Sequence, residues 1–224
     1  MGRFYLDVEY TNGNFYLGDI IEIALVSEES ENIFHSYVKI HYSVPYLVQQ
    51  LTNVTNKTIQ GGLSFKVVMR SLIEFIFCEQ VQRKTIPIII AHGGFLHDFP
   101  MLFVNCIKNS CDNYSILREC VYVDSMQLFL SAGYKKPGID GLCHVFNITN
   151  ETRKHHSAIY DAEILMSICK HRIDILLSPH IMLTLNDILL RLKEKLPIPI
   201  CKIFNLAMKC RSTNHTVYEL RKLK

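Results

Sequence analysis

The sequence lacks three features that mark whole classes of protein: a secretory start, an apolar run of membrane-spanning length and any Cys-x-x-Cys pair. A membrane-spanning helix needs about 20 consecutive apolar residues. A secretory signal combines a basic start, an apolar centre and a small-residue cleavage site. Neither pattern is present, so we expect a soluble intracellular protein, in the cytoplasm or nucleus, with no membrane partner.

The eight cysteines do not follow the pattern of a disulfide framework or a zinc site. Most of them fall inside apolar segments, and the closest group, Cys106, Cys111 and Cys120, lacks the ligand spacing of zinc sites. Reduced thiols buried in a core therefore explain them best, as is usual inside cells.

A chain of 224 residues, 49% of them hydrophobic, can bury one sizeable core. Its net charge of +3 conceals an asymmetry, because residues 191–224 contain nine Lys and Arg against two acids, and residues 1–190 contain fifteen against nineteen. A basic tail suits contact with a polyanion, although a solvated charged helix has the same composition. We predict a main domain over residues 1–180 and a basic, partly helical C-terminal extension over residues 181–224, packed on that domain or projecting from it.

Apolar patterning predicts three early strands and then shorter strands that alternate with helices. The early strands are expected at residues 3–10, 15–26 and 33–42, with Asn12-Gly13 as the first turn. The wholly apolar run at 87–91 is typical of a strand buried on both faces, and a further strand is expected at 119–123. Helices are expected at 45–51, 64–80, 125–130, 139–146, 153–177 and 184–196, and an apolar run of unassigned structure lies at 99–107. The predicted fold class is α/β, a mixed β-sheet of three antiparallel strands followed by parallel strands and flanked by helices.

Two carboxylates, Asp7 and Glu9, interrupt the first apolar run. Residues two apart in a strand point to the same face, about 6–7 Å apart along the chain. The repulsion of such a pair is relieved by a raised pKa, a basic neighbour or a bridging divalent cation. Because Arg3 lies four and six residues away, a cation is the better interpretation, and an exposed edge strand is the alternative.

Further candidate ligands follow later core elements. Asp98 comes shortly after the apolar run at 87–91, and ligands of open α/β sheets sit at the carboxyl ends of such strands. His156 and Asp161 fall at the start of a predicted helix, where five residues span about 7.5 Å along the axis. That offset is too long for both to bind one ion from one helix face, but it suits a carboxylate on a metal and an imidazole that reaches a metal-bound water.

These acidic residues and the histidine occur in an order that resembles the DEDDh 3′-to-5′ exonucleases of the DnaQ-like group, which have a ribonuclease-H-like fold. The resemblance covers about residues 3–177 and rests on five motifs in the family's order. The motifs are FYLDVEY at 4–10, LTNVT at 51–55, AHGGFLHDFPML at 91–102, YVDSMQLF at 122–129 and HHSAIYDAEIL at 155–165. The third motif is most similar to the TREX branch, the three-prime repair exonucleases, although the proline-rich insertion of the animal members is absent.

The resemblance implies a site for two Mg²⁺ ions, with Mn²⁺ as a substitute. Asp7, Glu9 and Asp161 are expected to hold the first ion, with Asp7 bridging to the second, and Asp98 to complete the site directly or through water. Two ions about 3.5–4 Å apart clamp the attacking water and the leaving oxygen of a phosphodiester. His156 is the expected general base that takes a proton from that water.

The same motif matching implies a set of substrate-binding residues. The set consists of Val8, Tyr10, Thr11, Val54 and His97. Val54 is expected to act as a wedge against the last base, and His97 to stack on a base or contact a phosphate. Core packing is the alternative role for each.

Two positions depart from the family's pattern. Gly93 stands where Asn is usual, and Asn53 stands where the loop usually has Gly. The first change is expected to loosen the support behind Asp98. The second suggests a positive φ, which Asn tolerates better than most residues.

The sequence thus predicts a metal-dependent 3′-to-5′ exonuclease that releases 5′-mononucleotides, with DNA favoured over RNA as substrate. The alternatives are a non-catalytic nucleic-acid-binding or scaffold protein and a proofreading subunit of a polymerase. The expected partner is single-stranded or 3′-ended nucleic acid, and a homodimer or a polymerase partner stays open.

Overall fold

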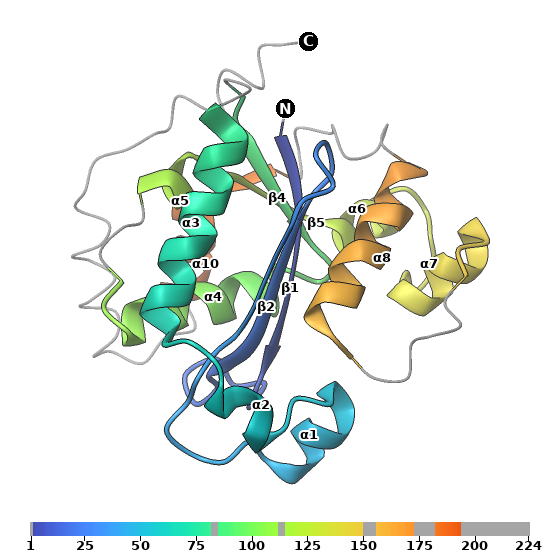
Figure 1. Ribbon diagram of the computed structural model, residues 1–224. Coiled ribbons are helices and arrows are strands. Elements are labelled where there is room, and N and C mark those ends of the chain that lie inside the picture. The colour runs from blue at the N-terminus through green and yellow to red at the C-terminus, as the bar shows by residue number, and fades with distance from the viewer. Residues whose placement is uncertain (1, 82–84, 112–114, 150–155, 173–181, 194–224) are drawn as a thin grey trace.

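A mixed six-stranded sheet forms the centre of the computed structural model, which describes residues 2–81, 85–111, 115–149, 156–172 and 182–193 (Figure 1). The strands are β1 Gly2–Tyr10, β2 Ile20–Ser27, β3 Ile33–Tyr37, β4 Pro87–Ala91, β5 Val121–Asp124 and β6 Met182–Thr184. They lie in the order β3-β2-β1-β4-β5-β6. The first three pair antiparallel, β1, β4 and β5 pair parallel, and β6 pairs antiparallel with β5. The predicted mixed sheet, of the ribonuclease-H-like type, is confirmed.

Strand β1 occupies the middle of the sheet because its side chains are apolar on both faces. Phe4, Leu6 and Val8 pack in one core, whereas Tyr5 packs in the other. Burying such a side chain stabilises the fold by about 1.5–3 kcal/mol. Asp7 and Glu9 therefore follow Tyr5 onto the second face, at the C-terminal end of the strand.

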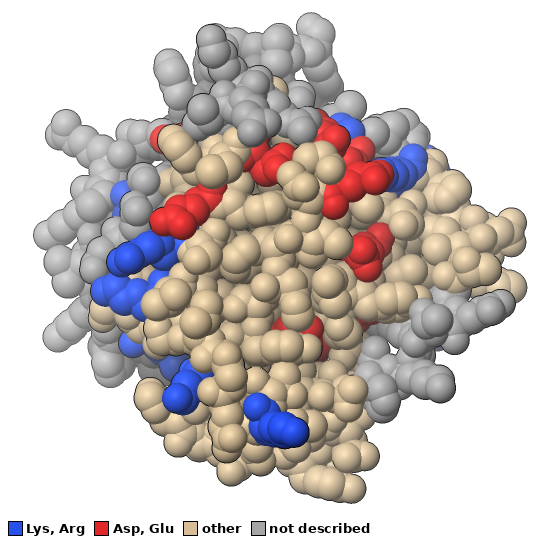
Figure 2. Space-filling view, viewed as in Figure 1, with Lys and Arg blue, Asp and Glu red and all other residues tan. Residues whose placement is uncertain are grey.

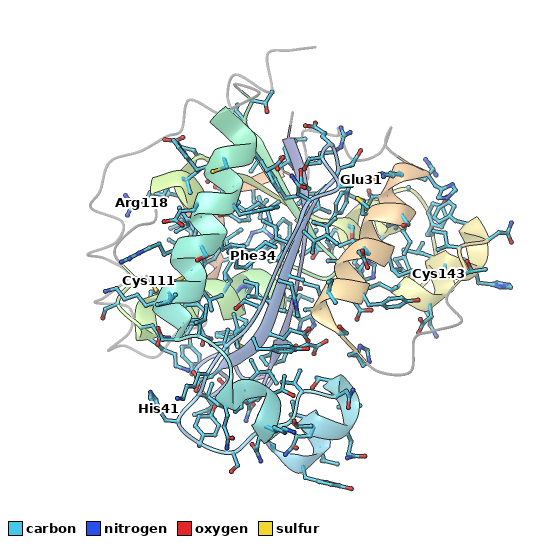
Figure 3. The ribbon with its side chains drawn as sticks, viewed as in Figure 1. Glu31, Phe34, His41, Cys111, Arg118 and Cys143 are labelled. Carbon is cyan, nitrogen blue, oxygen red and sulfur yellow. The ribbon has the colours of Figure 1, made fainter. Side chains whose placement is uncertain are left out.

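Helices cover both faces of the sheet. Their bounds are α1 Tyr46–Thr52, α2 Asn56–Gln60, α3 Phe65–Val81, α4 Asp98–Lys108, α5 Ser115–Glu119, α6 Ser125–Ser131, α7 Ile139–Phe146, α8 Ala158–Lys170 and α10 Leu185–Lys193. The first core lies against α3, α4, α5 and α10, and the second against α6, α7 and α8. Cys111 and Cys143, which belong to these two cores, accordingly lie on opposite sides of the sheet (Figure 3).

Helices α1 and α2 lie together at one end of the sheet (Figure 1). They enclose a small third core of Ile21, Val44, Val54 and Ile59. A capping box between Thr55 and Thr58 begins α2. This small core fixes the LTNVT segment against β2.

Strands β2 and β3 are shorter than predicted, whereas β1 matches its predicted range to within one residue. Strand β2 begins at Ile20, because the preceding residues form a turn in which Leu17 and Gly18 donate their N–H groups to the carbonyl of Asn14. Strand β3 ends at Tyr37, after which Val38 makes an isolated bridge to Leu63. Strand β4 and helix α7, by contrast, have the predicted bounds.

Strand β6 could not be predicted from the residue pattern. The segment is only three residues long and completes the sheet beside β5. The predicted capping box follows it, because Thr184 Oγ1 accepts from Asp187 N and Asp187 Oδ2 accepts from Thr184 N. The domain boundary at residue 180 stays a prediction, and most of the basic segment 191–224 lies outside the described residues.

Six cysteines fall in the described part of the chain, and all six are free thiols. Five are buried and Cys78 is exposed, whereas Cys201 and Cys210 lie outside the described residues. Among the described helices, none combines the length and apolar character that crossing a membrane requires.

Candidate active site

The site begins at the C-terminal end of β1. Asp7 and Glu9 lie there on one face, each with intermediate exposure to solvent. The pairing with β2 shifts register between Glu9 and Tyr10, and such a bulge bends the strand and re-aims its side chains. The first two predicted ligands are therefore neighbours on a rigid central strand.

Helix α4 brings Asp98 to this strand. Asp98 is the first residue of α4 and only 5% exposed, and its Oδ1 accepts a hydrogen bond from the backbone N–H of Val8 at 3.2 Å. Because Val8 lies between Asp7 and Glu9, this bond places the third carboxylate directly beside the first two. The side chain of Val8 itself points into the core.

Helix α8 brings Asp161 and His156. Ligand atoms of Glu9, His156 and Asp161 all lie within 4.8 Å of one another, and His156 Nδ1 is 3.5 Å from Asp161 Oδ2. The predicted helical offset between these two residues was wrong, because α8 begins at Ala158 and His156 precedes it. Extended residues before the helix let the imidazole approach the carboxylate that the helix presents.

Burial and mutual repulsion raise the pKa values of the clustered acids. Burial raises the pKa of Asp7 well above its usual value, and the carboxylates of Asp98, Glu9 and Asp161 raise it further. Burial also raises the pKa of Asp98 to about 7, even though the Val8 N–H favours the charged form. Bringing these groups together is therefore unfavourable unless positive charge accompanies them.

The basic residue on β1 does not supply that charge. Arg3 forms two hydrogen bonds with Glu28, at 2.7 and 2.6 Å, at the other end of the strand. Clustered carboxylate oxygens are the ligands that Mg²⁺ and Mn²⁺ prefer. The donor set of Asp7, Glu9 and Asp161 therefore fits divalent cations.

Asp124 supports the site, a role that the sequence analysis missed. This fully buried carboxylate ends β5, and it accepts hydrogen bonds from Gly93 N at 3.0 Å, Phe95 N at 3.1 Å and Met126 N at 2.9 Å. Gly93 has a φ of +71°, so the turn that leads into Asp98 is anchored to β5. An Asp at the end of a buried strand and directly before a helix is the signal that could have identified it.

The LTNVT segment meets the site through Leu51. The carbonyl of Leu51 accepts a hydrogen bond from His156 N at 2.9 Å, and its side chain is 58% exposed. Val54, predicted as the wedge, is 2% exposed and packs in the third core. Contact between Val54 and a base stays a prediction, whereas Leu51, whose backbone is bonded to that of His156, is an exposed apolar residue. Pattern could not separate them, because both are apolar residues of one short segment.

The other predicted substrate residues surround this site or support it. Thr11 is buried, and its hydroxyl accepts from Asp19 N at 3.0 Å and lies 2.9 Å from the hydroxyl of Tyr42. Tyr10 is half-buried, and burial raises its pKa to about 12. His97 is exposed and directly precedes α4. Their contacts with substrate stay predictions.

Charge is unevenly distributed on the surface. In the view of Figure 2, Lys and Arg gather along the left and lower margins, and most of the Asp and Glu lie toward the top. The left and lower margins are those of α3 and α2 in Figure 1. Lys57 in α2, and Lys66 and Arg70 in α3, are exposed there.

Comparison with known proteins places this geometry in a family. A family model described as RNase_T, Exonuclease, matches residues 4–169, from β1 to the end of α8. Among proteins with curated descriptions, none matches the chain significantly.

Several solved structures share the fold. Cell-death related nuclease 4 aligns with a TM-score of 0.63 and 15% identity over 78% of this chain and 64% of that one. The nuclease domain of 3′hExo, described as a DEDDh family member bound to rAMP, has a TM-score of 0.66 and 14% identity over 77% and 92%. A 3′-exonuclease described in 3′-end specific recognition of a histone mRNA stem-loop has a TM-score of 0.64 and 17% identity over 76% and 62%. The chain thus spans slightly less than two thirds of the first of these proteins.

Proposed function

The chain belongs to the RNase_T exonuclease family, and from this premise we propose that it removes 5′-mononucleotides from the 3′ ends of nucleic acid. The observation that carries the proposal is the convergence of Asp7, Glu9, Asp98 and Asp161, from three separate elements, in one acidic cluster. Retaining such a repulsive cluster makes physical sense if cations bind it.

Divalent ions supply the chemistry for which the family is known. Bound at this cluster, such ions would bring water to the scissile phosphate and stabilise the charge that develops there. We assign Asp7, Glu9 and Asp161 to one ion, Asp7 to a second as well, and Asp98 to the pair directly or through water. Mg²⁺ is the ion proposed, with Mn²⁺ as its substitute.

His156 is the proposed general base. Its exposed imidazole lies beside Asp161 and Glu9, where it can take a proton from a water that attacks the phosphate. The bond from His156 N to the carbonyl of Leu51 fixes its backbone. Position 157 is Ser, so the Tyr found four residues before the last Asp in a related group of exonucleases is absent.

The terminal nucleotide is proposed to lie between β1 and the LTNVT segment. Leu51 would contact the last base, and Tyr10 and Thr11 would line the opposite side. From the terminal nucleotide, the rest of the nucleic-acid strand would run toward the exposed Lys57, Lys66 and Arg70, because these side chains are cations that attract a phosphate backbone.

The branch and the preferred substrate are finer parts of the proposal. The AHGGFLHDFP motif at 91–100 favours the TREX branch and DNA, whereas two of the similar structures are described with rAMP or with an mRNA stem-loop. Hydroxyl groups at the 2′ position distinguish RNA from DNA. DNA and RNA must therefore be compared directly.

The test is digestion of matched DNA and RNA oligonucleotides labelled at the 3′ end, with Mg²⁺ or Mn²⁺ added. We expect release of labelled mononucleotide that stops in excess chelator and that falls about 10²- to 10⁴-fold in His156→Ala. Release of label in excess chelator, or tight binding with no release in Mg²⁺ or Mn²⁺, would contradict the proposal. The ratio of DNA to RNA rates decides the substrate.

A further inference from the structure

Glu22 is a buried carboxylate beside the acidic cluster that the proposed mechanism does not use. It lies in β2 directly opposite Glu9 in the antiparallel pairing and is 1% exposed. Its charge adds to the effects that raise the pKa of Asp7. A fifth acid in this place makes the cluster more repulsive, so its presence calls for a structural reason.

Both oxygens of Glu22 have partners. Oε1 lies 2.7 Å from Nε2 of His35, a residue of the neighbouring strand β3. Oε2 accepts a hydrogen bond from the backbone N–H of Ala158 at 3.3 Å. Since each oxygen is engaged by the protein, Glu22 is arranged to hold structure rather than to bind an ion.

The contact with Ala158 completes the N-terminus of α8. The first N–H groups of a helix lack partners within it and are usually satisfied by the side chain of the N-cap residue. Here the N-cap residue is Ser157, whose side chain makes no capping hydrogen bond. Glu22 takes over that role from a strand of the sheet, and its negative charge also suits the positive end of the helix dipole.

The capped turn carries the catalytic groups. Asp161 lies in the first turn of α8, three residues after Ala158, and His156 lies two residues before Ala158. Helix α8 packs on β1 and β2 through Ala158, Ala162 and Leu165 of the second core. Apolar packing holds the helix against the sheet, and the hydrogen bond from Ala158 N to Glu22 ties its first turn to one residue of β2.

We propose that Glu22, held in place by His35, is a positioning residue that caps α8 from β2 and thereby sets Asp161 and His156 against Asp7 and Glu9. The role rests on the proposed function, because it matters only if those residues bind ions. It predicts that a small shift of α8 weakens ion binding before it harms the fold.

The test compares Glu22→Ala, Glu22→Gln and a control, Glu79→Ala. Glu79 is also a buried carboxylate, but it accepts hydrogen bonds from Ser27 and Asn32, at and beyond the end of β2 that is farther from Glu22. Mn²⁺ affinity is measured for each variant by calorimetry without substrate. The Tm, kcat and KM of each variant are then measured separately. The calorimetry answers the question even if the wild-type protein proves inactive.

We expect Glu22→Ala to weaken Mn²⁺ binding and lower kcat about 10- to 100-fold, as for other residues that orient metal ligands, with little change in KM. Glu22→Gln keeps an oxygen for Ala158 N and should recover most of the loss. Glu79→Ala should lower Tm alone. Unchanged Mn²⁺ affinity in Glu22→Ala, or an equal loss in Glu79→Ala, overturns the proposal.

His35→Ala keeps the test decisive if Glu22→Ala does not fold. His35 lies on β3, which is the edge strand of the sheet, so its removal should leave the core intact. Loss of the His35 imidazole frees Glu22 to turn away from Ala158. Mn²⁺ affinity and kcat of His35→Ala should then both fall, as expected for Glu22→Ala, and wild-type values of both in His35→Ala would contradict a positioning role that depends on His35.

Discussion

Asp98 combines a fixed position with an unfavourable charge. Its carboxylate accepts the Val8 N–H, which holds it beside β1, and burial raises its pKa to about 7. An ordinary Asp has a pKa of about 4. Without cations, the folded protein therefore keeps a proton on Asp98 up to about pH 7, whereas the unfolded chain releases it near pH 4.

The direction of the pH effect follows from that difference. Because the folded state binds the proton more tightly, the contribution of protonated Asp98 to the free energy of unfolding is fully present below pH 4. That contribution is lost as pH rises from about 4 to 7. Within that window, each rise of one pH unit lowers the free energy of unfolding by about 1.4 kcal/mol for one such group. We predict that the Tm of protein in chelator falls between pH 5 and pH 7.5, and that Asp98→Asn makes this fall smaller.

Added Mg²⁺ should reduce the fall as well, because ion binding requires the ionised carboxylates. Thermal unfolding at a series of pH values, with chelator or with Mg²⁺, measures all three cases. The prediction is contradicted if the Tm in chelator rises from pH 5 to pH 7.5. It is also contradicted if the Tm of Asp98→Asn varies with pH in parallel with that of the wild type, because the raised pKa of Asp98 would then not affect stability.

Residue patterns could predict some of these positions and not others. The alternation of β1 was sufficient to put Asp7 and Glu9 on one face, because the side-chain period of a strand is two. The place of His156 could not be predicted from spacing, because the helix begins at Ala158, five residues later than its apolar pattern suggests and two residues after His156. Val54 and Leu51 are both apolar residues of one segment, and only the tertiary structure buries Val54 in the third core and leaves Leu51 exposed.

At the scale of elements, the turn between β4 and α4 depends on β5. Asp124 accepts N–H groups from Gly93 and Phe95 in that turn and from Met126 in α6. One carboxylate thus holds a turn, a strand end and a helix start together. Asp98 follows that turn directly, so its position depends on Asp124.

We predict that Asp124→Ala lowers the free energy of unfolding by at least about 2 kcal/mol, because one buried and two partly buried N–H groups lose their acceptor, at up to about 1–3 kcal/mol each. Exonuclease activity should fall further than the folded fraction does. Urea unfolding and kcat measure the two effects. Asp140→Ala, which removes an exposed acid from the first turn of α7, is the control, and a loss no larger than in that control would contradict the role.

Turn chemistry explains which element boundaries could be predicted. Asn53 ends α1 with a φ of +60°, as its place in the LTNVT motif led us to expect. The capping box of Thr184 and Asp187 was likewise visible in the sequence. Strand β6 was not, because three residues carry no periodicity and their pairing with β5 is a tertiary contact.

At the scale of the whole molecule, the sheet order brings together residues that are far apart in the chain. Strands β1 and β4 are parallel neighbours, so the turn after β4 opens beside the end of β1. Helix α8 packs on β1 and β2 on the face of the sheet opposite α4, and it adds Asp161 to the acidic cluster. The family resemblance predicted this convergence, whereas composition and spacing could only suggest that acids follow core elements.

The central claim is that cations, bound by these acids, are the reason for their convergence. Anomalous diffraction from crystals grown with Mn²⁺ tests it most directly, because it locates the ions without reference to activity. We predict Mn²⁺ within about 2–2.5 Å of carboxylate oxygens of Asp7, Glu9 and Asp161, with a second ion on Asp7. An anomalous map with no Mn²⁺ at these three residues would contradict the account.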